Sequence, residues 1–173
     1  MFKFRSKLHV CTAAALLLAA VAVDAQETKF SAKLTGAAEL PEPRNTTATG
    51  VLELVLNPDG QSISYRLTVS KLVNAAVADL HLGPATANGP LVVRLFPAHG
   101  AAAKKGEFSG VLAEGEFDAT DLIGPMLGAS LQDLVDQIRD GNTYTNIHTN
   151  DGTDPPNSGA GDYRVGEIRG QID

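Results

Sequence analysis

The sequence predicts an all-β protein, an antiparallel sandwich or barrel of Greek-key type with one short helix. Three observations lead to this fold class. Apolar and polar residues alternate with the period of half-buried strands through much of residues 26–173. Turn-forming residues recur at short intervals, and strands and helices do not alternate in the βαβ rhythm of a parallel sheet.

The strands are predicted in order along the chain. Residues 51–56 and 63–69 flank the turn Asn57-Pro58-Asp59-Gly60 and are predicted to pair as a hairpin. The segments 106–112 and 114–117 contain glycines and are predicted as short edge strands or a bulge. The other predicted strands are residues 30–34, 77–82, 91–96, 143–149 and 167–172, with a polar loop over residues 150–161.

One helix is predicted after Ser130. Ser130 is a favourable N-cap, with Asp133 at the third helical position, and Gly141 stands where a C-terminal cap is expected. The apolar stripe that this helix would bury consists of Leu131, Leu134, Val135 and Ile138.

The first 25 residues are typical of a secretory signal peptide. A basic leader precedes an apolar run over residues 10–23, and a small residue, Ala25, stands at the expected cleavage position. A membrane anchor is the alternative, but this run is shorter than the roughly 20 residues that a bilayer requires. We therefore expect a secreted or periplasmic protein in which residues 26–173 form a single β domain. Cys11 is the only cysteine, so this domain cannot contain disulfides.

The acidic composition excludes some partners. The net charge is −6, and it becomes about −8 without the first 25 residues, whereas nucleic acids and anionic lipids require basic surfaces. The expected partner is an extracellular protein or a cell-surface component, with no membrane contact after cleavage. An uncovered edge strand would also permit oligomers.

Several blocks of this sequence, in matching order, carry a family resemblance. They are LTGAAELPEPRNTTATGVLELVLNPDGQSISYRLTVSKL, HLGPATANGPLVVRLF, NTYTNIHT and GEIRGQI. Over about residues 28–173 the chain resembles the CHRD (chordin-type) domain family. The resemblance implies an immunoglobulin-like β domain that acts as a secreted binding module without an established catalytic activity. Many members have a histidine at the position of Asp79, whereas this chain has the pair Asp79 and His81.

Asp79, His81 and His148 are the candidate metal ligands. Residues i and i+2 of a strand point to the same face, so Asp79 and His81 emerge side by side. If their strand neighbours that of His148, two imidazoles and a carboxylate converge. This ligand set suits copper or zinc, with Asn146 nearby. The alternative is that both histidines are ordinary surface residues.

Three functional classes follow. The first is a binding module without catalysis, which the resemblance favours, and the second is a copper- or zinc-binding periplasmic protein. The third is a redox or hydrolytic enzyme built on the same metal. No catalytic set is recognisable: Glu167 and Arg169, which share a strand face, are predicted to form a structural ion pair.

Overall fold

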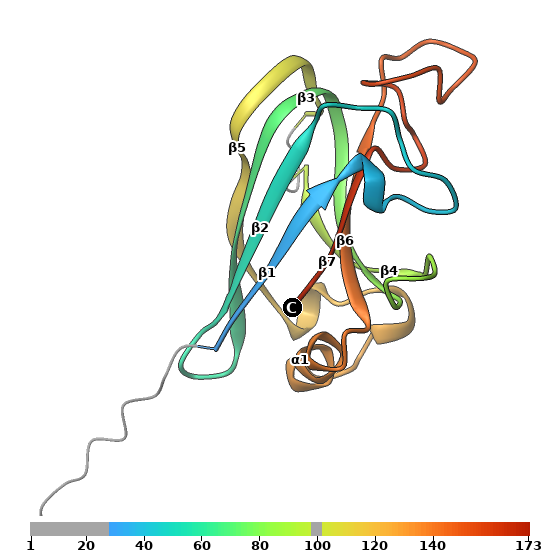
Figure 1. Ribbon diagram of the computed structural model, residues 1–173. Helices are drawn as coiled ribbons and strands as arrows, with labels where there is room; N and C mark the ends of the chain where they lie inside the picture. The colour runs from blue at the N-terminus through green and yellow to red at the C-terminus, as the bar shows by residue number, and fades with distance from the viewer. Residues whose placement is uncertain (1–27, 98–101) are drawn as a thin grey trace, which may run out of the picture.

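The computed structural model describes residues 28–97 and 102–173, so the predicted signal peptide lies outside the described residues (Figure 1). Within them the chain forms antiparallel strands, three short 3₁₀ turns and one α-helix. The elements are β1 (Thr28–Thr35), β2 (Thr49–Leu56), β3 (Ser62–Leu82), β4 (Leu91–Phe96), β5 (Lys104–Asp118), α1 (Leu131–Arg139), β6 (Thr143–Thr149) and β7 (Ile168–Gln171). The 3₁₀ turns are Gly36–Ala38, Ala119–Asp121 and Gly124–Met126.

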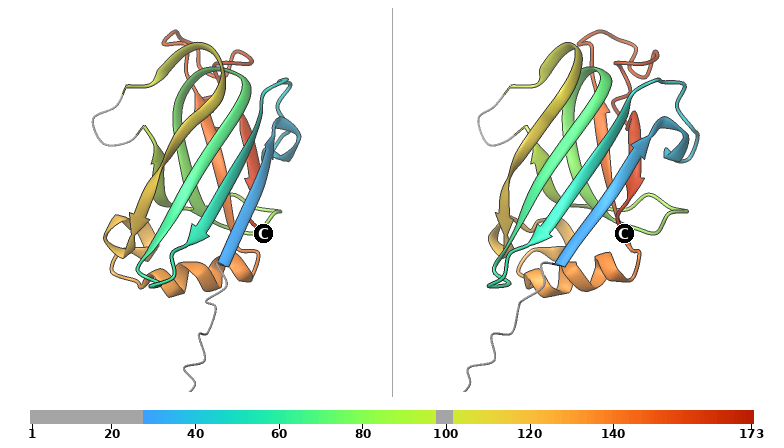
Figure 2. Two further views of the ribbon diagram at one scale, coloured as in Figure 1. Left: turned by 90° about the vertical axis from the view of Figure 1, so that its left-hand side faces the viewer. Right: turned by 60° about the vertical axis from the view of Figure 1, so that its left-hand side comes forward.

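The sheet closes on itself through the long strand β3. The strands follow the order β2-β1-β7-β6-β3-β4, and β2 also pairs with β3. The first part of β3 lies between β2 and β5, whereas its last part lies between β6 and β4. Figure 2 shows the strands wrapped around a common interior, with α1 across one end. The predicted all-β antiparallel sandwich or barrel with one helix is therefore confirmed.

Strand β3 corrects one prediction. The sequence predicted separate strands at 63–69 and 77–82, but they are two parts of one continuous strand. Between them Lys71 and Asn74 have positive φ angles of 54° and 52°, and the pairing with β5 shifts register on either side. Such bulges bend a strand and increase its twist, so β3 can pass from one side of the barrel to the other.

Strand β5 also differs from its prediction, because one strand spans the two short segments that were expected. Its glycines do cause irregularity: Gly106 and Gly110 have φ angles of 78° and 134°. Among the described residues β5 pairs only with β3, which makes it an edge strand as predicted.

The structure confirms the helix predicted after Ser130. The Ser130 hydroxyl accepts a hydrogen bond from the Asp133 backbone N–H, while the Asp133 carboxylate accepts one from the Ser130 N–H. All four residues of the apolar stripe are buried. Within the described part of the chain, no helix is both long and apolar enough to cross a membrane.

The core is formed by the inward side chains of every strand and of α1. On β3, Ala78 and Leu80 point into the core and are fully buried, as is Ile147 on β6. Because side chains alternate along a strand, Asp79, His81 and His148 emerge on the opposite face. The fold therefore presents these polar residues on the outer side of the β3–β6 pair.

Candidate metal centre

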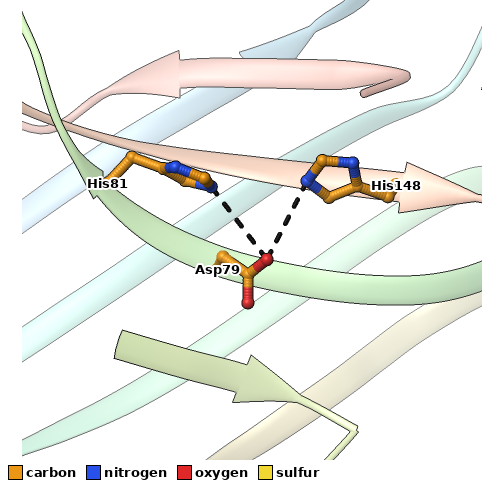
Figure 3. Close-up of side chains that lie close together, drawn as sticks. All are labelled: Asp79, His81 and His148. Carbon is orange, nitrogen blue, oxygen red and sulfur yellow. Dashed lines mark ion pairs between the residues drawn. The ribbon is translucent and has the colours of Figure 1, made fainter. Parts of the chain in front are cut away.

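Strand register brings the three predicted ligands together. Asp79 and His81 lie two residues apart on β3, and β6 pairs with β3 so that Asp79 is opposite Asn146 and Val77 is opposite His148. The two imidazoles therefore flank the Asp79 carboxylate from either side. Figure 3 shows both rings directed toward this carboxylate.

The distances are compatible with a shared ion. Nε2 of His81 is 4.0 Å from Asp79 Oδ2, and Nε2 of His148 is 3.9 Å from the same oxygen. One ligand atom from each residue can be chosen so that all three lie within 4.8 Å of one another. Two ligand atoms of a tetrahedral ion lie about 3.4 Å apart when each bond is about 2.1 Å. The three ligand atoms therefore need to approach one another by about 1.4 Å at most.

Backbone carbonyls set the tautomer of both histidines. Nδ1 of His81 lies 3.0 Å from the Gly89 carbonyl oxygen, and Nδ1 of His148 lies 3.0 Å from the Arg164 carbonyl oxygen. A carbonyl only accepts hydrogen bonds, so each Nδ1 carries a proton and donates it. In the neutral ring Nε2 is then left with a lone pair, which is the form that binds a metal.

The ring of His81 is held by a stack of side chains. It lies parallel to the Tyr144 ring, with the centroids 4.9 Å apart and an interplanar angle of 10°. The Arg169 guanidinium carbon lies 3.9 Å from the Tyr144 centroid. The Tyr144 hydroxyl accepts a hydrogen bond from the Gly89 N–H at 3.0 Å, which ties the stack to the loop that orients His81.

Arg94 on β4 is a positively charged neighbour of the Asp79 carboxylate. Its Nε lies 2.6 Å from Asp79 Oδ1 in an ion pair, which leaves Oδ2 facing the histidines. Burial raises the pKa of Asp79 to about 6, although Arg94 opposes this shift. Burial also lowers the pKa values of His81 and His148, so both rings favour the neutral form.

The ion pair predicted between Glu167 and Arg169 is wrong. The Glu167 carboxylate accepts hydrogen bonds from the hydroxyls of Thr46 and Thr149 and from the Gly161 N–H. Arg169 instead donates to carbonyls of the loop after β3, those of Pro84, Ala85 and Ala87. Each group therefore fixes a different loop, and residue spacing alone did not reveal these partners.

Comparison with known protein families identifies the family of this chain. The CHRD domain family model matches residues 30–156, which include Asp79, His81 and His148. The chain belongs to the CHRD domain family. No curated protein matches it.

This CHRD domain has a cavity of about 300 Å³ beside the candidate ligands. Asp79, His148 and Arg164 are among the residues that line it. A ligand bound to an ion held by the three side chains would therefore have room next to the site. Sequence reasoning found the three candidate ligands but missed Arg94 and Arg164, because no spacing rule connects these two residues to them. The i, i+2 rule places Tyr144 on the same strand face as His148, but its stacking on His81 was not predicted.

Proposed function

We propose that this CHRD domain is a secreted or periplasmic binding module that holds a divalent transition ion, Cu(II) or Zn(II). The ligands are Nε2 of His81, Nε2 of His148 and Oδ2 of Asp79. Family membership supports a binding module rather than an enzyme, and the signal-peptide pattern of residues 1–25 supports export.

One observation carries the metal proposal: three hydrogen-bond acceptors face one another with no donor between them. Both Nδ1 atoms already donate their protons to backbone carbonyls, so both Nε2 atoms offer lone pairs to an anionic oxygen. Nε2 of His81 is buried and has no hydrogen-bond partner. An unpaired buried acceptor is costly, and a cation bound by all three atoms would satisfy Nε2 of His81.

The hydrogen bonds made by Nδ1 of both histidines support the same proposal. Metal-binding histidines commonly donate their second ring N–H to a carbonyl or carboxylate, and here both do so. Two imidazoles and a carboxylate suit Zn(II) or Cu(II), and three protein ligands leave coordination positions open.

Calorimetric titration of the purified, metal-free protein with Cu(II) and Zn(II) tests the proposal. One ion should bind per chain, and His148→Gln, His81→Gln and Asp79→Asn should each weaken binding by about a hundredfold or more, since each removes a ligand. The matched control is Asp136→Asn, because Asp136 is an exposed carboxylate on α1. Wild-type affinity in the three ligand variants, or no binding to the wild type, would refute the proposal.

A further inference from the structure

We propose that the metal-loaded site binds a small oxyanion, such as a carboxylate or inorganic phosphate, in the cavity beside His148. This inference rests on the proposed metal site and assigns the ligand that would fill its open coordination position. The contacts of the cavity, the charges of the site and the state of Arg164 support it.

The cavity adjoins the metal site directly. Its volume of about 300 Å³ matches the lower end of the range for small-molecule pockets. Asp79 and His148 line it together with Ala76 and Val77 of β3, Thr149 at the end of β6, and Arg164. A ligand in this space would reach an ion bound to Asp79 and His148.

The site carries a net positive charge once the ion is bound. A divalent ion brings two positive charges, and the histidines bind as neutral rings. The one carboxylate among the ligands, Asp79, is already paired with Arg94 at 2.6 Å. Asp79 is almost fully buried, so this net charge is poorly solvated. An anionic ligand on the open position would neutralise it.

Arg164 supplies a donor at the cavity wall. Its Nη1 is 3.1 Å from Asp154 Oδ1, and its Nη2 donates to the Thr153 carbonyl. Its Nε is buried and makes no hydrogen bond among the described residues, since Asp162 Oδ1 lies 3.6 Å away. This N–H forms an ion pair with Asp162 but no hydrogen bond, so it can donate to an oxyanion. Guanidinium groups bind carboxylates and phosphates well.

The experiment uses Cu(II)-loaded protein with azide as the probe, because azide bound to Cu(II) produces a charge-transfer absorption band. Azide should bind saturably, and acetate and inorganic phosphate should displace it. Arg164→Gln should weaken azide binding by about tenfold, as expected for the loss of a charge-assisted hydrogen bond, and Arg164→Lys by less. Ala76→Leu should also weaken azide binding because it fills the cavity without removing a ligand.

The control variant is Arg66→Gln, which removes an exposed arginine paired with Glu114. Copper binding without an azide band overturns the oxyanion inference and leaves the metal proposal intact. Equal azide affinity in wild type, Arg164→Gln and Ala76→Leu overturns the assignment to this cavity. Failure of the wild type to bind either Cu(II) or Zn(II) overturns both proposals. Thermal melting of each variant identifies any that is misfolded. If either Arg164→Gln or Ala76→Leu is misfolded, the azide affinity of the other variant tests the assignment to this cavity.

Discussion

The Asp79 carboxylate contacts Arg94 through one oxygen and faces His81 and His148 through the other. Nε of Arg94 lies 2.6 Å from Oδ1, while Oδ2 faces Nε2 of both histidines at 4.0 and 3.9 Å. The arginine thus orients a candidate ligand and also places a positive charge close to the proposed ion. Orientation favours metal binding and the charge opposes it, so substitution of Arg94 separates the two effects.

We expect Arg94→Gln to strengthen Cu(II) and Zn(II) binding by about fivefold at pH 8, since it removes a charge that repels the ion and competes for Asp79. The effect is modest because the Arg94 side chain is 43% exposed and therefore screened by solvent. Calorimetry at low and high salt checks this, with Arg66→Gln as the control. Weaker binding in Arg94→Gln would show that orientation of Asp79 outweighs repulsion.

Tyr144 provides a second prediction, because its ring stacks on His81 and its hydroxyl contacts Gly89. Tyr144→Phe keeps the stack and loses the hydroxyl contact, whereas Tyr144→Leu loses both. We expect Tyr144→Leu to weaken metal binding by about tenfold, as for other groups that orient a metal ligand, and Tyr144→Phe to weaken it less. Titrations below the melting temperature of each variant measure this. Equal affinities for the two variants would rule out a role for the stacked ring.

The sequence predicted the elements and ligands that depend on local periodicity. Strand alternation placed Asp79 with His81, and the caps of α1 were readable because the residues involved lie three positions apart. The continuous strand β3 was not predicted, since its bend at Lys71 and Asn74 depends on pairing with other strands. Arg94 was missed for a similar reason: only the β3–β4 register places it opposite Asp79.

Gly89 provides a third prediction, because its carbonyl oxygen accepts a hydrogen bond from the Nδ1–H of His81. A Cβ atom at this position would lie 1.7 Å from the Leu82 carbonyl oxygen, so Gly89→Ala must displace the loop. We expect a loss of about 2 to 3 kcal/mol in the free energy of unfolding, together with weaker metal binding. Urea denaturation and calorimetry measure the two effects.

The control for Gly89→Ala is Gly60→Ala. A Cβ atom at Gly60 meets nothing within 4 Å, although its φ of 68° is unfavourable for alanine. We expect Gly60→Ala to cost about 1 kcal/mol and to leave metal affinity unchanged. If both variants bind metal like the wild type, the Gly89 carbonyl does not control His81.

The last prediction concerns Glu39, a buried carboxyl that takes no part in the metal site. Burial raises its pKa to about 7, although Arg44, Arg169 and the Asn146 amide partly oppose this shift. A pKa that is higher in the folded state than in the unfolded state lowers stability as the pH rises between the two values. The pKa of Glu39 in the unfolded chain is near 4.5. The stabilising contribution of the protonated carboxyl to the free energy of unfolding is therefore complete below pH 4.5 and is lost by about pH 7.

Glu39→Gln removes this titration and keeps the shape of the side chain. The stability difference between Glu39→Gln and wild type should therefore change in favour of the variant by about 2 to 3 kcal/mol from pH 4.5 to pH 7.5. Urea denaturation of both proteins across this range measures the difference, with Glu53→Gln as the control because Glu53 lies on the outer face of β2, opposite Arg66 of β3. A difference that does not vary with pH would show that Glu39 ionises as readily in the folded protein as in the unfolded chain.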